Sequence, residues 1–323
     1  MSTYSKPWLS VADQIAHLQA RGMHIPNVDR AKRYLTTAGY YHLSGYWYPM
    51  RSSGVVNGQR VVLDSFLPLV SFDHVVAMFQ FDKELRTLLL EAITRIEQAL
   101  KVDLAHHLGK EDTFAHLHAR HFSPGFVNPQ PKLLKNGATR TPVSHADWII
   151  SHNKKLTRPN EFVKHHQRKY GPELPIWVAI EVMDFGDVLY LIDGLRQKWR
   201  APMAVRFGLP DESRFSSWLG ALRSLRNLCA HHGRVWNHAS PAIPATVSLK
   251  ELPQFSSLHG PPSLWNKPYA TFMIVAYLNK QVVPASRWQQ RFAAALATIP
   301  AAPGIDIKYA GAPANWATDP TWL

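Results

Sequence analysis

The clearest pattern in the chain is an apolar stripe that runs through residues 71–109. Apolar side chains recur there at intervals of three and four residues, which is the spacing of a helix with one buried side. Oppositely charged residues spaced by four, such as Glu91 and Arg95, fall on the polar side, and Gly109 is expected to end the helix as a C-cap glycine. The pattern predicts a long core helix whose buried stripe consists of Leu85, Leu88, Leu89, Ala92, Ile93, Ile96, Ala99, Leu100 and Leu104.

The region before this helix combines short helices with aromatic residues. Ser10 is a suitable N-cap for a first helix, and residues 28–39 predict a second one. Gly54, Asn57 and Gly58 mark a turn that is followed by a short Val-Val-Leu run, which predicts a hairpin strand. Between the second helix and this turn lies an aromatic stretch with Tyr40, Tyr41, Tyr46, Trp47 and Tyr48.

Helical periodicity returns in the second half of the chain. Residues 175–195 predict a helix that Phe185-Gly186 kinks or ends, and residues 216–237 predict another. Residues 268–299 predict a pair of helices that Pro284 interrupts. The tail, residues 300–323, is rich in Pro, Ala and Gly and is expected to be irregular. The predicted fold class is therefore mostly α, with a helical bundle as its core.

These elements divide the chain into three predicted units. Residues 1–66 form an N-terminal helical and aromatic region, and residues 67–240 form the helical core. Residues 241–323 form a C-terminal helical pair with its irregular tail. The core contains an insertion over about residues 120–172 in which prolines, glycines and histidines are frequent.

Charge is the strongest indication of a partner. The chain carries a formal net charge of +13 and has an isoelectric point near 9.8. A nucleic acid explains such an excess well, because each Lys or Arg set against a phosphate releases a condensed counterion. An anionic membrane surface is the alternative, but no helix with a Lys/Arg face stands apart from the globular pattern.

The compartment is predicted from the cysteine content and from the apolar runs. The single cysteine, Cys229, is typical of a reducing environment. The first residues are polar and contain Asp13 where a signal peptide has its apolar core. No apolar run is long enough to span a bilayer. We therefore expect a cytoplasmic protein without a membrane partner.

The insertion is a candidate RNA-binding surface. Between Lys132 and Lys169 the sequence has nine Lys or Arg residues and two acidic residues. A solvated loop and helix would have the same composition, and both interpretations are compatible. The cations expected to contact RNA are Lys154, Lys155, Arg158, Lys164, Arg168 and Lys169.

The aromatic stretch offers a second way to bind RNA, because unpaired bases stack on aromatic rings. Tyr41 and Tyr46 are the candidates for such stacking. The alternative is that the run belongs to the core and exposes only its polar tips, which we favour for Trp47.

Candidate catalytic residues lie in the predicted helix over residues 216–237. Arg223, Asn227 and His231 are spaced by four and therefore share one helical stripe. Arg226 is adjacent, at about 140° from His231, and Arg234 lies about 80° from Arg226. Histidine can move the proton of a ribose 2′-hydroxyl, arginine can hold the phosphate, and Asn227 can orient the imidazole. His232 is an alternative to His231, and RNA contacts are expected from Arg223, His232 and Arg234.

Two other groups are weaker candidates. A histidine cluster with nearby carboxylates could bind a metal ion, but it lacks a recognised zinc spacing and partner cysteines. Cys229 falls on the apolar side of its helix and is expected to pack as a small hydrophobic residue. We therefore expect no metal site and no cofactor. The cluster consists of His106, His107, His116, His118 and His121 with Asp103, Glu111 and Asp112.

The segment LRNLCAHHGRVWN resembles the R-N-x-x-x-H signature of HEPN domains, in the form found in abortive-infection proteins of the Abi-like (AbiD/AbiF-type) family. Other segments resemble the same family in the same order, from about Lys6 to Trp322. They are YYHLSGYWYPM, FDKELRTLLLEAITRIEQALKVDLAHHLG, PIWVAIEVMDFGDVL and GAPANWATDPTWL, and Ala312 in the last stands where the family tends to have an aromatic residue.

This resemblance implies a HEPN-like helical core and a metal-independent endoribonuclease that leaves a 2′,3′-cyclic phosphate, in a phage-defence or toxin–antitoxin system. The matching positions are Arg226, Asn227 and His231, and two copies would meet in a homodimer to complete the site. The alternative is a non-cleaving protein that forms a ribonucleoprotein with a small structured noncoding RNA. A DNA-binding regulator is a third possibility, although no helix-turn-helix with a base-reading face is evident.

Overall fold

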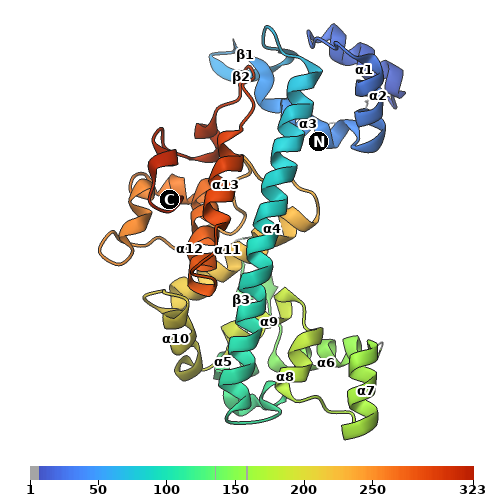
Figure 1. Cartoon of the computed structure of the whole chain (residues 1–323). Coiled ribbons are helices and arrows are strands. Elements are labelled where there is room, and N and C mark those ends of the chain that lie inside the picture. The colour runs from blue at the N-terminus through green and yellow to red at the C-terminus, as the bar shows by residue number, and fades with distance from the viewer. Residues whose placement is uncertain (1–6, 135, 158) are drawn as a thin grey trace.

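A long central helix organises the molecule. The computed structural model describes residues 7–134, 136–157 and 159–323. Its architecture is mostly α, which confirms the predicted fold class (Figure 1). Within the described residues, no helix is both long and apolar enough to cross a membrane. The helices that pack on the central α4 (Phe72–Gly109) include α11 (Glu212–Ala230), α12 (Pro268–Val282) and α13 (Trp288–Ala297).

The predicted core helix is confirmed as α4, which has 38 residues and is therefore about 57 Å long. It begins with a reciprocal cap, in which Ser71 Oγ accepts from the N–H of His74 and the His74 ring accepts from the N–H of Ser71. The predicted role of Gly109 is wrong, since Gly109 is the last helical residue and the C-cap is Lys110 in a right-handed helical conformation. A Cβ atom at Gly109 would lie 3.1 Å from the ring of Trp177, so the glycine allows this ring to approach closely.

The N-terminal region contains the two predicted helices and a hairpin, but the hairpin turn differs from the prediction and the aromatic stretch forms a third helix that was not predicted. Ser10 caps the first helix and accepts from the N–H of Asp13 at 3.2 Å. Asn57 and Gly58 make the turn with φ values of 50° and 74°, whereas Gly54 lies inside a strand opposite Val61. The elements are α1 (Val11–Ala20), α2 (Val28–Thr37), α3 (Tyr40–Trp47), the 3₁₀ helix η1 (Tyr48–Met50), β1 (Arg51–Val56) and β2 (Gln59–Phe66), with β1 and β2 antiparallel.

The insertion is folded and contains a stacked group of aromatic rings. The ring of Trp148 is stacked between the rings of His145 and His152, with centroids 6.4 and 5.0 Å away, and Trp148 and Val163 are buried. The unit is therefore more than a solvated loop. After η2 (Ala115–Leu117), which precedes it, the insertion contains η3 (Ala119–His121), α5 (Pro124–Val127), the short antiparallel strands β3 (Lys132–Leu133) and β4 (Thr139–Arg140), α6 (His145–Leu156) and α7 (Glu161–Tyr170).

The helix predicted over residues 175–195 is divided in two. The backbone becomes extended at Met183, and Asp184 then caps a new helix by accepting from the N–H of Asp187 at 2.9 Å. The side chain of Asp184 bonds to the backbone as an N-cap, and this ends the first helix and starts a second one. The elements here are α8 (Ile176–Ala179), η4 (Ile180–Val182), α9 (Phe185–Gly194) and α10 (Gln197–Arg206).

The predicted C-terminal helical pair is confirmed as α12 and α13. Helix α12 is apolar on nearly all sides and almost entirely buried, as expected of a helix inside a bundle. The tail is irregular but packed, because Trp322 is buried and its indole N–H donates to the Tyr269 hydroxyl at 3.0 Å. The remaining 3₁₀ helices are η5 (Pro253–Leu258), η6 (Pro262–Asn266), η7 (Ile307–Ala310) and η8 (Trp316–Thr318).

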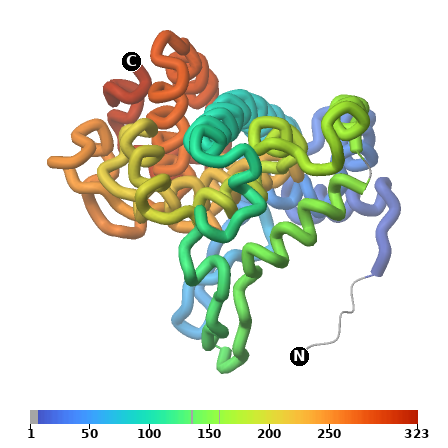
Figure 2. The backbone as a smooth tube through the Cα atoms, turned by 90° about the horizontal axis from the view of Figure 1, so that it is seen from below, coloured from blue at the N-terminus to red at the C-terminus, as the bar shows by residue number. Residues whose placement is uncertain are grey.

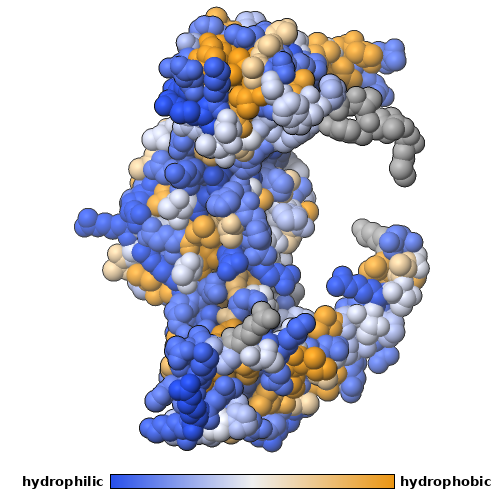
Figure 3. Space-filling view, turned by 90° about the vertical axis from the view of Figure 1, so that its right-hand side faces the viewer, coloured by the Kyte–Doolittle hydropathy of each residue, from blue (hydrophilic) through white to orange (hydrophobic). Residues whose placement is uncertain are grey.

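One hydrophobic cluster runs through all three predicted units, from Ile15 to Trp322. The division at residues 66 and 240 therefore stays a prediction. Viewed along α4, the C-terminal helices lie on one side of it and the insertion extends to the other (Figure 2). The molecule is elongated, and one of its sides is hollowed between the two ends (Figure 3).

A buried carboxylate connects three parts of the chain. Asp82 of α4 is fully buried and forms an ion pair with Arg86, which is 5% exposed. It also accepts from the hydroxyl of Tyr46 at 2.9 Å and from the N–H groups of Val235 and Trp236 at 3.0 and 2.8 Å. This cluster, the Asp82 hub, joins α4 to α3 and to the segment that follows α11.

We predict that Asp82→Ala lowers the free energy of unfolding by about 3–5 kcal/mol, because it leaves the buried Arg86 charge and two backbone N–H groups without their acceptor. Urea unfolding followed by circular dichroism measures this change. The matched control is Asp29→Ala, which removes an exposed carboxylate 3.8 Å from Lys32 and should cost less than about 1 kcal/mol. Equal effects of the two substitutions would contradict a central role for Asp82.

Candidate functional site

Helix α11 presents the predicted Arg-Asn-His stripe on its outer side. Arg223, Asn227 and His231 are all exposed, whereas Leu222 and Leu225 on the opposite side are buried. The spacing of four therefore places the three polar side chains on one accessible face. Their catalytic or RNA-binding roles stay predictions.

The C-terminal end of α11 differs from the prediction of a helix over residues 216–237. The helix ends at Ala230, and His231 is the C-cap. His232 has a φ of 59°, and the N–H groups of His232 and Gly233 donate back to carbonyl groups of the last turn at 3.1 and 2.8 Å. This is a Schellman motif, in which the left-handed residue reverses the chain. His231 is therefore fixed at the point where the helix stops.

This helix end has two special positions. A non-glycine residue in the left-handed region costs about 1–2 kcal/mol, so His232 is held there against its intrinsic preference. At the next position a Cβ atom would lie 2.3 Å from Cδ1 of Leu228, so Gly233 has no substitute without a shift of Leu228. Gly233, the glycine that follows the two histidines, was visible in the sequence as an indication that the helix ends here.

Arg234 does not flank Arg226 on the helix, and this prediction is wrong because the chain has already left the helix. The guanidinium of Arg234 turns toward α3 and donates to the carbonyl of Gly45. Burial lowers the pKa of Arg234. Its guanidinium thus contributes to the packing of α3, and its RNA-binding role stays a prediction.

Arg226 of α11 lies close enough to Glu97 of the central helix for their charges to interact. It is half-buried, and its Nη1 donates to Oδ1 of Asn227 at 3.3 Å. Burial raises the pKa of Glu97 on α4, while the charges of Lys101 and Arg226 oppose the rise. Glu97 forms its ion pair with Lys101, at 3.8 Å, and Arg226 adds a second positive charge in its neighbourhood.

His231 and His232 both remain accessible. Both side chains are exposed, and among the described residues no hydrogen bond or ion pair engages the ring of His231. The ring of His232 lies near His42 of α3, whose pKa is lowered by burial and by the charges of Arg86 and His232. An accessible imidazole is the minimum requirement for proton transfer, and His231 meets it at the helix end.

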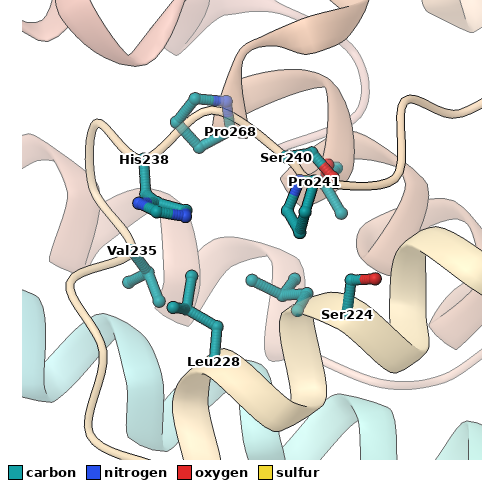
Figure 4. A pocket seen from close by; sticks show the side chains of 9 residues that line it. Ser224, Leu228, Val235, His238, Ser240, Pro241 and Pro268 are labelled. Carbon is teal, nitrogen blue, oxygen red and sulfur yellow. The ribbon is translucent and has the colours of Figure 1, made fainter. Parts of the chain in front are cut away.

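The inner side of α11 contains a cavity that is too small for a substrate. Its volume is about 20 Å³, which is room for about one water molecule. Figure 4 shows the side chains around it pointing inward from α11 and from the segment after it. This cavity therefore holds no substrate, and the candidate residues Arg223, Asn227 and His231 lie on the exposed outer face. The lining residues are Ser224, Leu225, Leu228, Val235, His238, Ser240, Pro241, Pro268 and Thr271.

Cys229 packs as the sequence analysis predicted. It is buried, and burial, followed by the negative charge of Asp82, raises the pKa of its thiol to about 12. A thiol in this state is a poor nucleophile, so the interpretation of Cys229 as a small core residue is favoured.

The predicted RNA-binding cations of the insertion fall into two groups. Lys155 is paired with Asp184 and Asp187 at 2.7 and 2.5 Å, and Lys164 with Glu161 at 2.7 Å. Their charges are already balanced by neighbouring carboxylates. The cations that are exposed on α6 and α7 without an ion pair among the described residues are Lys154, Arg168 and Lys169, and Arg158 lies outside the described residues.

The two tyrosines proposed for base stacking have different surroundings. Tyr41 is 74% exposed and remains a candidate. Tyr46 is fully buried and bonded to Asp82 in the Asp82 hub, so the prediction that it stacks on RNA bases is wrong. Trp47 is buried, as favoured.

The structure brings together three members of the histidine and carboxylate cluster. Asp112, His118 and His121 each direct one potential ligand atom to a common point, and these atoms lie within 4.8 Å of one another. His116 is buried elsewhere, against His152, with ring centroids 5.8 Å apart. The spacing of these residues along the sequence did not indicate that Asp112, His118 and His121 are the three members of the cluster that lie together.

Comparison with known proteins identifies a family. A family model described as Abi-like protein matches residues 33–237, which is more than half of the 323 residues. The match includes α4, the insertion and the whole Arg-Asn-His stripe. None of the curated proteins and none of the solved structures compared with the chain matches it.

We predict that Cys229 reacts with iodoacetamide at pH 8 roughly a thousandfold more slowly in the folded protein than in urea, because only the thiolate is reactive and the pKa of the folded thiol is about 12. Mass spectrometry at timed intervals measures the labelling, which is specific because the chain has one cysteine. Comparable rates in the two states would show that the inner side of α11 is open.

Proposed function

The chain belongs to the family of Abi-like proteins, which act in abortive infection against phage, and on this premise we propose that it is a HEPN-type endoribonuclease. The proposed reaction is cleavage of RNA by attack of a ribose 2′-hydroxyl on the adjacent phosphate. It needs no metal ion. The single observation that supports it is the exposed Arg-Asn-His stripe at the end of α11, on a chain with a net charge of +13.

Each residue of the stripe has a proposed role in this reaction. His231 accepts the proton of the 2′-hydroxyl or gives one to the leaving 5′-oxygen. Arg226 holds the phosphate and stabilises the additional negative charge of the transition state. Asn227, which accepts from Arg226 at 3.3 Å, orients the guanidinium. Arg223, one turn before Asn227 on the same exposed face, contacts the neighbouring phosphate.

A second copy of the chain is proposed to complete the site. Within one chain Arg226 faces Asn227 and the Glu97 side of α4, whereas His231 stands at the helix end. Two α11 helices packed about a two-fold axis would set the arginine of one copy beside the histidine of the other. This arrangement also brings four arginines, Arg223 and Arg226 from each copy, to one RNA strand.

The exposed cations of α6 and α7 are proposed to bind the RNA backbone beyond the site. Lys154, Arg168 and Lys169 are the members of this group that no carboxylate neutralises within the described part of the chain. Tyr41 is proposed to stack on an unpaired base. Affinity for RNA should therefore fall as the salt concentration rises.

We predict that purified, RNA-free protein cleaves labelled total RNA in the presence of EDTA. Arg226→Ala and His231→Ala should each lower the rate by at least about a hundredfold, the usual contribution of one acid–base or charge-stabilising group. Matched controls are Arg287→Ala and His259→Ala, which change exposed residues of the same types outside the stripe. Their rates should equal that of the unsubstituted protein.

The same preparation tests the alternative, a non-cleaving ribonucleoprotein. If neither the unsubstituted protein nor any variant cleaves RNA, and one discrete RNA copurifies with the protein, then the protein binds RNA and is not a nuclease. Sequencing of the copurified RNA would then identify the partner.

We also predict complementation between inactive variants. Heterodimers that combine one Arg226→Ala chain with one His231→Ala chain, isolated with two different affinity tags, should recover activity above that of either homodimer, because one intact Arg–His pair re-forms across the interface. The control is a dimer, isolated with the same two tags, in which both chains carry both substitutions. Absence of recovery in dimers of confirmed composition would place the whole site within one chain.

A further inference from the structure

A group of metal-ligand residues lies at the far end of α4, where the chain enters the insertion. Oδ2 of Asp112 is 2.6 Å from Nδ1 of His118 and 2.9 Å from Nε2 of His121. Asp112 and His121 have side chains that are 8% exposed, whereas that of His118 is 44% exposed. The group is thus closed on its inner side and open to solvent on one side.

Backbone hydrogen bonds hold these three residues in place. The second oxygen of Asp112, Oδ1, accepts from the N–H of Phe114 at 3.0 Å, which leaves Oδ2 directed at the two rings. The N–H of His118 donates to the carbonyl of Ala115, and the carbonyl of His121 accepts from the N–H of Arg196. Side chains positioned in this way need only small shifts to bind one ion, as a preformed site requires.

We propose that Asp112, His118 and His121 bind a divalent transition-metal ion of the zinc class. Two imidazoles and one carboxylate form a donor set that suits Zn²⁺, with ligand distances of about 2.0–2.2 Å. Three protein ligands leave the fourth position to water, on the open side beside His118. The proposal revises the expectation from the sequence that the chain has no metal site.

Arg120 is the competitor of the ion. Its Nη2 lies 2.5 Å from the same Oδ2 of Asp112, and its Nε lies 3.3 Å from Nε2 of His121. Its side chain is 65% exposed, so it can turn away into solvent when the ion binds. Two positive charges on one carboxylate repel each other, and removal of Arg120 should therefore strengthen metal binding.

The ion would fasten the loop after α4 to the insertion. Asp112 follows the end of α4, while His118 and His121 belong to η2–η3 and the turn between them. The Asp82 hub, which holds the end of α11, lies about 40 Å away along the same helix. The proposed metal site is therefore independent of the proposed nuclease, which is expected to act in EDTA.

The test is titration of the full-length protein, first stripped with EDTA, with Zn²⁺ by calorimetry and with Co²⁺ by visible absorption. We expect one ion per chain and a Co²⁺ spectrum typical of nitrogen and oxygen ligands. Asp112→Asn and His118→Ala should each weaken binding by roughly tenfold or more, and Arg120→Ala should strengthen it. His106→Ala, which changes an exposed histidine on α4, is the matched control and should bind as the unsubstituted protein does.

Circular dichroism in EDTA establishes that each variant is folded, and the exposed His118 keeps the test valid if substitution of a buried ligand is not tolerated. Binding that is the same in the Asp112→Asn, His118→Ala and unsubstituted proteins would overturn the proposal. So would the absence of any Zn²⁺ uptake. In either case the group is an ion-pair cluster of Asp112 with Arg120 and the two histidines, whatever the outcome of the RNA cleavage assay.

Discussion

The buried carboxylate of Asp82 is the constraint on which the rest of the structure depends. A charge without solvent is tolerated only when it is paired and fully hydrogen-bonded, and Asp82 obtains its partners from Arg86, Tyr46 and the backbone of Val235 and Trp236. These partners come from three distant parts of the chain. The chain after α11 can therefore leave the helix in one direction only, and this fixes where His231 stands.

Much of the fold could be predicted from the sequence because local signals agreed with the tertiary arrangement. The three-and-four spacing from Leu85 to Leu104 gave α4, and the Asn57-Gly58 pair gave the hairpin turn. Helix boundaries were less predictable where a cap competes with periodicity. The break expected at Phe185-Gly186 is a new helix start that Asp184 caps, and the Schellman motif at His232 stops α11 before residue 237. Periodicity describes which side is buried, but hydrogen bonds at the caps decide where a helix ends.

The residues of the candidate site could be predicted from the sequence, but the contacts of the side chains around them could not. The spacing of Arg223, Asn227 and His231 was sufficient to place them on one exposed face. The roles of Tyr46 and Arg234 were not predictable, since their burial depends on Asp82 and Gly45, which are distant in sequence. A signal was nevertheless present in α4, where a charged pair spaced by four, Asp82 and Arg86, interrupts an otherwise apolar side. Such a pair on a buried stripe indicates an internal ion pair that organises other segments.

The position of the stripe at a helix C-terminus has a consequence for anion binding. The C-terminal end of a helix carries partial negative charge, so it repels a phosphate, in contrast to the N-terminal end that binds one. A phosphate at the end of α11 must therefore be held by side-chain cations. In one chain, Arg226 is already partly balanced by Glu97, and Arg234 is committed to the carbonyl of Gly45. Arg223 alone compensates this negative potential weakly, so the proposed reaction would gain from arginines that a second copy of the chain supplies.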